Sequence, residues 1–282
     1  MKEFKNKTAV ITGAASGIGY GIAKKCVQEG MKVVLADIEV KALKKVEREL
    51  NREGASVLSV LTDVSKVSEV EMLAKKTIDF FGAVHLLFNN AGVGFAKYAW
   101  NYTIKDWKWQ IGVNLFGVIN GIRIFVPIML EQDSEGLIVN SASIEGLISG
   151  INIGGAAYGV SKHAIISLSE ILRAELELKK TKLKVFVLCP GPVESKLFLS
   201  VRNRQEEFQN DPINIIQDSR FEDSIKVLGD KMKKVSSISP EVAGNLIFQA
   251  IRDNKFYILT HTQQVFKDMV KERMREILES FD

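Results

Sequence analysis

Tyr158 and Lys162 are the residues whose types and spacing point most directly to chemistry. Apolar periodicity predicts a helix over Ala156–Lys179, and residues four apart share one helix face. A free tyrosine has a pKa of about 10, which is too high for a base at neutral pH. A neighbouring ammonium stabilises the phenolate and lowers that pKa, so the pair predicts an acid/base centre. The same spacing is common on solvated helix faces, so the rest of the sequence must decide between the two.

A glycine-rich turn joins the first predicted strand, Thr8–Thr12, to the first predicted helix, Gly17–Gly30. Glycines let the backbone turn tightly and approach a phosphate, and free N–H groups at the helix start favour its negative charge. The glycine spacing differs from the commoner Gly-x-Gly-x-x-Gly, and a plain βα turn is the alternative. Its place after the first strand favours a dinucleotide site. The expected binding residues are Gly13, Ser16, Gly17, Ile18 and Gly19.

Asp37 follows the second predicted strand, Lys32–Ala36, at about the interval where an acid reaches the adenosine ribose. A carboxylate there accepts hydrogen bonds from the ribose hydroxyls and repels a 2′-phosphate. Neither Ala15, Ser16 nor Ile38 is a cation that would attract such a phosphate. The sequence therefore predicts NAD rather than NADP. The alternative is that Asp37 only caps the next helix.

Strands and helices alternate along the chain, without repeats or low-complexity stretches. Short apolar strands separated by helices predict a parallel sheet covered on both faces, and right-handed crossovers make it doubly wound. We therefore expect an α/β fold: a single-domain, Rossmann-type doubly wound parallel sheet flanked by helices, over residues 1–282. The later strands are expected at Ser56–Leu61, Val84–Asn89, Leu137–Ser141, Lys184–Leu188 and Phe256–Leu259.

The later helices are expected at Val40–Gly54, Ser65–Phe81, Thr103–Leu130, Ser239–Asp253 and Gln264–Ser280. Ser65 or Ser68 is the expected N-cap of the second of these, and Ser239 followed by Pro240 begins the fourth. The segment 195–238 breaks the alternation, and we expect it to be an insertion that covers the substrate.

Composition excludes several classes of protein. The net charge of +4 comes from scattered basic residues, so nucleic-acid binding is not expected. Two cysteines and three histidines without ligand spacing predict neither a disulfide framework nor a metal site, and His261 is expected at the surface. The charged start is not a secretory signal, and the apolar runs fall short of the roughly 18 residues that a membrane span needs. A soluble, cytoplasmic protein is expected.

With these motifs in order, the chain resembles the classical short-chain dehydrogenase/reductase family over nearly all of 5–260. The glycine turn and the Tyr158–Lys162 pair match, and four further motifs carry the likeness. They are Leu61-Thr62-Asp63-Val64, Asn89-Asn90-Ala91-Gly92, Asn114 within Val113-Asn114-Leu115, and Ser143 within Ser143-Ile144-Glu145-Gly146. Pro190-Gly191 after the sixth strand completes the set.

The resemblance implies roles for these residues. Tyr158 exchanges a proton with the substrate oxygen, Ser143 orients that oxygen, Lys162 lowers the pKa of Tyr158 and holds the nicotinamide ribose, and Asn114 positions a water that relays protons. The cofactor supplies the hydride chemistry. Further cofactor contacts are implied at Asp63, Val64, Asn90, Ala91, Gly92, Pro190, Gly191, Val193 and Ser195.

Some positions depart from the family pattern. Ser141 also lies near the expected site, and we prefer Ser143 as the catalytic serine because the family's serine usually precedes a glycine by three residues. The stretch between Ser143 and Tyr158 is about two residues longer than usual and rich in glycine. Ser195 stands where the family usually has threonine, which keeps a hydroxyl for the nicotinamide amide.

Together these features predict an NAD(H)-dependent oxidoreductase that interconverts a secondary alcohol and a ketone on an apolar small molecule. Two alternatives stay open: a non-catalytic regulator that senses NAD, and an epimerase or dehydratase that keeps NAD tightly bound. The family also implies a homodimer or homotetramer, paired through the long helices 104–130 and 156–180.

Overall fold

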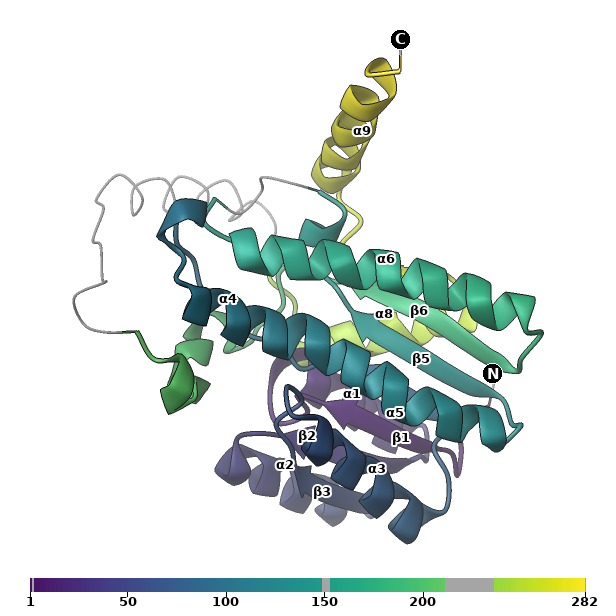
Figure 1. Ribbon diagram of the computed structural model, residues 1–282. Helices are drawn as coiled ribbons and strands as arrows, with labels where there is room; N and C mark the ends of the chain where they lie inside the picture. Colours follow the sequence, from purple (N-terminus) through teal and green to yellow (C-terminus); the bar gives the residue numbers. More distant parts are fainter. Residues whose placement is uncertain (2, 149–152, 211–235, 282) are drawn as a thin grey trace.

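The computed structural model describes residues 1, 3–148, 153–210 and 236–281. Its centre is one parallel sheet of seven strands in the order β3-β2-β1-β4-β5-β6-β7 (Figure 1). The strands are β1 Thr8–Thr12, β2 Lys32–Asp37, β3 Val57–Leu61, β4 Leu86–Asn89, β5 Gly136–Ser141, β6 Leu183–Cys189 and β7 Tyr257–Leu259. The order reverses direction at β1, from which the chain winds first to β3 and then across to β7. The prediction of a doubly wound Rossmann-type fold is confirmed.

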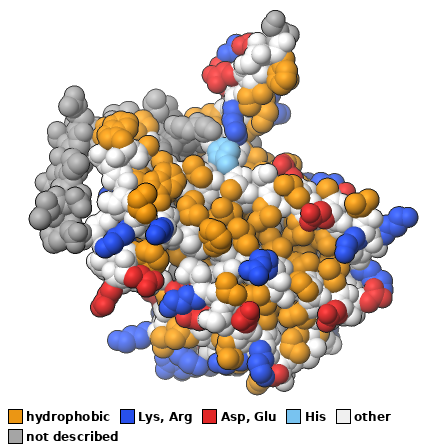
Figure 2. Space-filling model, viewed as in Figure 1, with side chains coloured by type: hydrophobic (Ala, Val, Ile, Leu, Met, Phe, Trp, Pro, Cys, Tyr) orange, Lys and Arg blue, Asp and Glu red, His pale blue; other side chains and the backbone are white. Residues whose placement is uncertain are grey.

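Helices cover both faces of the sheet. One layer holds α1 Gly17–Gln28, α2 Val40–Arg52 and α8 Pro240–Arg252, and the other holds α3 Val67–Phe81, α5 Gly117–Glu131 and α6 Ala156–Leu178. The outer surface of the second layer is rich in hydrophobic side chains (Figure 2). Phe116, Val160 and Ile171 are each about half exposed there.

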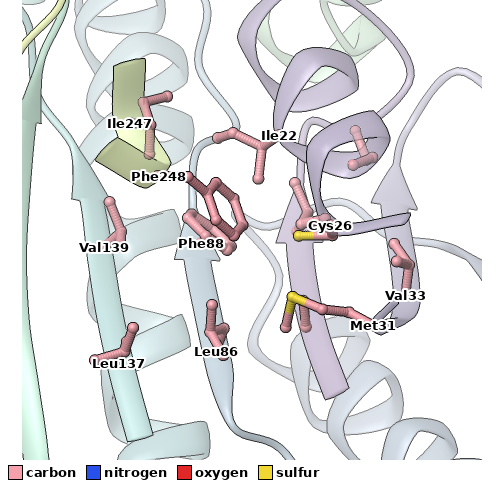
Figure 3. Close-up of a cluster of buried hydrophobic side chains, with 14 of the residues drawn as sticks. Ile22, Cys26, Met31, Val33, Leu86, Phe88, Leu137, Val139, Ile247 and Phe248 are labelled. Carbon is pink, nitrogen blue, oxygen red and sulfur yellow. The ribbon is translucent and has the colours of Figure 1, made fainter. Parts of the chain in front are cut away.

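The core follows from the alternation of side chains along buried strands. Ile11, Leu35 and Phe88 point toward α1 and α8, where Phe248 stacks on Phe88 (Figure 3). Their sequence neighbours point to the opposite face and pack with α3, α5 and α6. Both faces of the sheet are therefore buried, which explains why the strands carry nearly unbroken apolar runs.

Helices α1 and α8 cross at a pair of glycines. A Cβ on Gly21 would lie 1.9 Å from the Pro240 carbonyl oxygen, and a Cβ on Gly244 would lie 2.5 Å from the Gly21 oxygen. Any larger residue would push the helices apart. The start of α8 is as predicted, because the Ser239 side chain accepts a hydrogen bond from Val242 N–H and Pro240 occupies the first turn.

The helix expected at Thr103–Leu130 is interrupted. It consists of α4 Ile104–Ile111, a π-helical turn η2 at Gly112–Phe116, and α5. By length and composition alone, Ile104–Glu131 is long and apolar enough to cross a membrane, with an 18-residue window of mean hydropathy 1.8. Half of that apolar window is buried, and Trp109, Val118 and Phe125 lie in the interior, which is the pattern of a core helix.

Short helical turns and one long helix complete the described chain. The turns are η1 Ala99–Asn101, η3 Ile144–Gly146, η4 Leu197–Asn203 and η5 Glu206–Phe208. The last helix, α9 Gln264–Glu279, projects from the body, and only Phe266 on it is buried (Figure 1). Of the expected insertion at 195–238, the part 211–235 lies outside the described residues.

Candidate active site

The predicted site residues gather at the carboxyl ends of the strands. The glycine turn follows β1, Asp37 ends β2, Asn90 follows β4, Ser143 follows β5 and Pro190 follows β6. Strand order reverses at β1 and β4, and the crevice at such a switch point is where open α/β sheets bind ligands. The topology alone therefore brings these distant segments to one edge.

The backbone of the glycine turn lies very close to neighbouring backbone segments. Gly13 and Gly17 have φ of 65° and 53°, a region that other residues rarely adopt. A Cβ on Gly13 would lie 2.8 Å from Ala91 Cα, and one on Gly19 would lie 2.1 Å from the Gly13 oxygen. Within the described chain, the Ser16 side chain does not cap α1. The N–H groups at the start of α1 are thus left for an anion such as a pyrophosphate, and the residues present fit a dinucleotide.

The Thr12 hydroxyl ties this turn to the end of β4. Its Oγ1 accepts hydrogen bonds from Asn90 N–H at 2.8 Å and Ala91 N–H at 3.0 Å. The Asn90 amide donates back to the Thr12 carbonyl oxygen at 3.0 Å. Ala91 and Gly92 then lead the chain to the catalytic side, where a Cβ on Gly92 would lie 3.8 Å from Lys162 Nζ.

Asp37 sits at the end of β2 with both carboxylate oxygens turned toward backbone N–H groups. Oδ2 accepts from Ala15 and Oδ1 from Glu39, each at 2.9 Å. Burial raises the pKa of Asp37, and these two N–H groups oppose the rise. Because an oxygen can accept a second hydrogen bond, the carboxylate can still receive ribose hydroxyls. The structure thus places Asp37 beside the glycine turn, where the sequence predicted it.

Asp63 lies at the end of β3, almost fully buried. Its Oδ1 accepts from the Ser65 hydroxyl at 2.6 Å, and its Oδ2 accepts from the Gln205 amide at 2.8 Å. Ser65 therefore does not cap α3: the N-cap is Lys66, and the expectation of Ser65 or Ser68 there is wrong. Val64 is buried beside Gly117, whose added Cβ would lie 2.7 Å from it.

Tyr158 and Lys162 point into one site, from the first turns of α6. The Lys162 Nζ lies 5.4 Å from the centre of the Tyr158 ring and donates to the Ser141 carbonyl oxygen at 2.8 Å. Burial raises the pKa of the Tyr158 phenol, the charge of Glu145 adds to that rise, and a hydrogen bond with the Ser143 side chain opposes it. Burial also lowers the pKa of Lys162 to about 8.

The two candidate serines face different partners. The Ser141 hydroxyl donates to Asn90 Oδ1 at 3.2 Å, away from the phenol. The Ser143 side chain interacts with Tyr158 and also accepts from Glu145 N–H at 3.2 Å, which fixes the η3 turn. This geometry favours Ser143 over Ser141 as the serine beside the reacting oxygen.

Asn114 lies in the π-helical turn, fully buried. Its amide nitrogen donates to the Val93 oxygen at 3.0 Å and to the Ser161 hydroxyl at 3.2 Å, and its Oδ1 accepts from Val93 N–H at 2.8 Å. Asn114 therefore holds the chain after β4 against the helix that carries Tyr158 and Lys162. Both amide N–H groups are used, so only an oxygen lone pair of this side chain is left for a water.

The segment after β6 closes over the same edge. The Pro190 oxygen accepts from Ile144 N–H at 2.9 Å, and Val193 pairs with Ile238 in an isolated bridge. A Cβ on Gly17 would lie 2.8 Å from Ser195 Cβ, so Ser195 packs on the glycine turn.

Gly191 packs against His261, because an added Cβ there would lie 2.7 Å from the imidazole. His261 is only 3% exposed, so the expectation of a surface position is wrong. Burial lowers the pKa of this imidazole.

We define residues 195–210 as the strap, whose contacts the sequence did not reveal. Arg202 forms an ion pair with Glu39, and Asn203 donates to the same carboxylate at 3.0 Å. Ser200 exchanges hydrogen bonds with the backbone of Gly94, at 2.9 and 3.1 Å. These pairs are more than 100 residues apart in sequence, so no local pattern could predict them.

Comparison with known proteins agrees with this arrangement. The short chain dehydrogenase family model matches residues 7–206. A curated relative, the CLA biosynthesis dehydrogenase/reductase of Lactiplantibacillus plantarum, is 32% identical over 281 residues, 99% of this chain and 95% of its own. The C alpha-dehydrogenase of a Sphingobium strain is 33% identical over 264 residues, 93% of this chain and 83% of its own.

Among solved structures, a short chain dehydrogenase/reductase from Burkholderia phymatum in complex with NAD is similar throughout. It has a TM-score of 0.91 and 38% identity, and the match covers 99% of this chain and 97% of that one.

Proposed function

The chain belongs to the short-chain dehydrogenase/reductase family of oxidoreductases, and on that basis we propose that it interconverts a secondary alcohol and a ketone with NAD(H). The observation that carries the proposal is the meeting of Tyr158, Ser143 and Lys162 at the edge of the sheet that also holds the glycine turn. A proton-exchanging group beside a dinucleotide site is what a reversible hydride transfer at a carbon bearing oxygen requires.

In the proposed reaction, a bound nicotinamide would supply or accept the hydride. Tyr158 exchanges a proton with the substrate oxygen, and Ser143 holds that oxygen by a hydrogen bond. The Lys162 ammonium lies 5.4 Å from the centre of the Tyr158 ring, where its positive charge would stabilise the phenolate form. Asn114 positions the chain between the cofactor side and α6.

NAD is the proposed cofactor because Asp37 ends β2 beside the glycine turn. Its carboxylate accepts two backbone N–H groups and carries a charge that disfavours a 2′-phosphate. Glu39, two residues on, adds a second acidic side chain, although Arg202 pairs with it. The similar Burkholderia phymatum protein was solved with NAD, which supports the same choice here.

An apolar substrate is proposed because the surroundings of Tyr158 are apolar. An added Cβ on Gly94 would lie 3.7 Å from the Tyr158 ring and 3.5 Å from Leu197 Cγ. Phe95 follows in the chain and packs against the buried core. We also propose a cytoplasmic homodimer or homotetramer, with α5 and α6 as the pairing surface.

The testing experiment measures turnover of apolar secondary alcohols and ketones with NAD(H) and NADP(H), in the wild type and Tyr158→Phe. The variant keeps the ring and removes the acid/base hydroxyl, so we expect at least about a hundredfold loss of kcat. Ser143→Ala should lower kcat by a similar factor. The matched control is Ser141→Ala, which should lower kcat much less because the Ser141 hydroxyl faces Asn90.

The alternatives give different results in the same experiment. A sensor of NAD would bind the cofactor and turn over none of the panel. An epimerase or dehydratase would convert substrate without a net change in nicotinamide absorbance. Activity that survives in Tyr158→Phe would contradict the assignment of Tyr158.

A further inference from the structure

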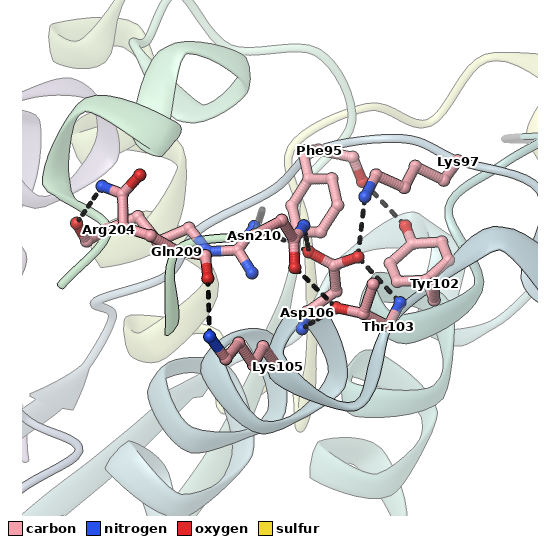
Figure 4. A network of polar contacts seen from close by, with 9 residues as sticks. All are labelled: Phe95, Lys97, Tyr102, Thr103, Lys105, Asp106, Arg204, Gln209 and Asn210. Carbon is pink, nitrogen blue, oxygen red and sulfur yellow. Dashed lines mark hydrogen bonds and ion pairs between the residues drawn. The ribbon is translucent and has the colours of Figure 1, made fainter. Parts of the chain in front are cut away.

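We propose that Arg204, with Lys97 and Gln110, forms a subsite for the carboxylate of the substrate, which would make the substrate a long-chain hydroxy or oxo acid. This inference rests on the function proposed above and specifies its substrate class. It is carried by a buried polar network between the strap and α4 that the catalytic mechanism leaves unused (Figure 4).

Asp106 is the centre of this network and is completely buried. Its carboxylate accepts from Lys97 Nζ at 2.8 Å, the Asn210 amide at 2.8 Å, Thr103 N–H at 2.9 Å and Arg204 Nη1 at 2.7 Å. Four donors use the full accepting capacity of one carboxylate. These contacts hold the pKa of Asp106 down at about 2 against the effect of its burial.

Among the described residues, the network carries an excess positive charge. Lys97 and Arg204 are two cations, and in the described part of the chain the ion pairs of both lead to the same acid, Asp106. The side chain of Arg204 is 6% exposed and that of Lys97 is 27% exposed. A buried excess charge is costly unless a counter-charge joins it, so the site favours an anion.

Arg204 also has hydrogen-bond donors to spare. Its Nε and Nη2 are buried, and among the described residues no acceptor lies within hydrogen-bonding distance of them. Its guanidinium lies 5.6 Å from the centre of the Phe95 ring and 5.2 Å from that of the Trp109 ring. The faces of these rings attract the cation, but they offer no lone pair to its N–H groups. A guanidinium with two free neighbouring nitrogens matches a carboxylate.

Gln110 is a second, independent sign of an absent polar group. It is completely buried on α4, one turn after Asp106, and both its amide nitrogen and its amide oxygen lack a partner among the described residues. Buried polar atoms are almost always paired in native structures. An amide can donate to a carboxylate or bridge to it through water.

Two segments, α4 and the chain after β4, connect the subsite to the catalytic centre. Asp106, Gln110 and Asn114 follow one another at intervals of four residues, and Asn114 bonds to Ser161 next to Lys162. Eight residues of regular α-helix rise about 12 Å, and the distance here is at most that, because the π-helical turn begins at Gly112. On the other side, an added Cβ on Gly94 would lie 3.7 Å from the Tyr158 ring, and the ring of the next residue, Phe95, lies 5.6 Å from the Arg204 guanidinium. A substrate that reaches both places needs a chain of several methylene groups between its carboxylate and its reacting carbon.

The environment along this distance suits such a chain. Leu197 lies against Gly94, and Phe95 stacks on Trp109 with ring centres 5.7 Å apart. Leu197 and Phe95 carry no hydrogen-bonding group, so they offer the apolar contact that methylene groups require, and Trp109 supports Phe95 from the interior. The class that fits is therefore an amphipathic acid with its oxygen in mid-chain.

The test compares three probes that differ only at the carboxyl end: hydroxystearic acid with a mid-chain hydroxyl, its methyl ester, and the secondary alcohol with a methyl group in place of the carboxyl. We expect wild-type kcat/KM with NAD to be on the order of 10- to 100-fold higher for the acid, since hydrogen bonds to charged groups carry that much. Arg204→Gln should abolish the preference for the acid, so that kcat/KM for the acid falls to the value for the ester measured in the same variant.

Arg202→Gln is the matched control, because it removes a guanidinium from the same strap at a contact with Glu39. It should keep the wild-type ratio of kcat/KM between acid and ester, even if a looser strap raises KM for NAD. If Arg204 had a purely structural role, Arg204→Gln would lower kcat/KM for the acid and for the ester by the same factor, and that result would overturn the subsite. Equal turnover of acid and ester by the wild type would overturn it too, while leaving the proposed function standing.

Calorimetric binding of the three probes makes the two proposals separable. If none of them is oxidised, the proposed function fails for this class. In that case, tight binding of the acid alone that is lost in Arg204→Gln would still support the subsite. Equal affinity for the three probes, or no binding of any of them, would reject it.

Discussion

Lys162 is a buried ammonium whose ionisation should affect both catalysis and stability. It is 4% exposed, and burial lowers its pKa from 10.5 to about 8. At neutral pH it is mostly charged, which the proposed role beside Tyr158 requires. Burying that charge costs folding free energy, so Lys162 destabilises the fold while it serves the proposed chemistry.

This cost should vary with pH in a predictable direction. Between about pH 8 and 10, Lys162 is neutral in the folded protein and charged in the unfolded chain, so the unfolded state binds more protons and stability due to this group rises with pH. We expect Lys162→Met to be more stable than the wild type at pH 7, with a difference that shrinks toward pH 10. Denaturant unfolding of both cofactor-free proteins measures it.

The comparison between the two proteins is essential in that experiment. Burial raises the pKa of Cys26, Cys189 and Tyr158, and those groups lower stability as the pH rises through their unfolded pKa values. The contributions of Cys26 and Tyr158 are common to both proteins and cancel in the difference. The charge of Lys162 lowers the pKa of Cys189, so both proteins are compared in a Cys189→Ala background. A difference that stays constant from pH 7 to 10 would contradict a buried, titrating Lys162.

At the scale of elements, the strap is held where the adenosine end of the cofactor is proposed to bind. Burial alone would raise the pKa of Glu39, but the hydrogen bond from Asn203 and the ion pair with Arg202 hold it below its ordinary value. Glu39 therefore stays charged at neutral pH. Because Glu39 lies two residues after Asp37 in the sequence, its contacts hold the strap close to Asp37. Gln205 makes the equivalent contact at Asp63.

We expect Glu39→Gln to raise KM for NAD about threefold with little change in kcat, because a partly exposed ion pair contributes modestly. The mechanism is a looser strap over the adenosine side, away from Tyr158. Lys44→Gln is the control, since it breaks an ion pair with Glu47 on the same helix α2, away from the strap. A fall in KM for NAD would mean instead that the strap competes with the cofactor.

The elements show what local sequence could and could not predict. Strands such as β4 and β5 were identifiable because apolar residues buried on both faces leave unbroken runs. The apolar pattern alone does not show the π-helical turn at Gly112–Phe116, because it runs through the turn unchanged. The hydrogen bonds of Asn114 to Val93 and Ser161 hold this turn in place, and they are long-range.

The site was predictable to the extent that it lies at strand ends. Gly13, Asp37, Ser143, Tyr158 and Lys162 each sit in a short motif beside a predicted element, so the topology brings them together. Arg204 carries no such motif. Its contacts with Asp106, Phe95 and Trp109 join segments about 100 residues apart, and only folding reveals them.

At the scale of the whole molecule, the outer face of the α5–α6 layer exposes a row of large hydrophobic side chains. Phe116, Val160 and Ile171 are 52%, 52% and 54% exposed, and Leu178 extends the row along α6 at 85%. Residues 160, 171 and 178 are spaced by 11 and 7, so they lie on one helix face. Figure 2 shows hydrophobic side chains gathered over this layer.

A symmetric dimer would bury this row against its own copy, since the two-fold axis pairs the same patch on both subunits. We expect Ile171→Glu to convert a dimer or tetramer into a smaller species, because the substitution places two carboxylates against each other in an apolar interface. Light scattering coupled to gel filtration measures the mass. Phe80→Glu, at an equally exposed aromatic on α3, should leave the mass unchanged. A wild-type protein that is monomeric at micromolar concentration would contradict the pairing, and so would an Ile171→Glu variant that keeps the wild-type mass.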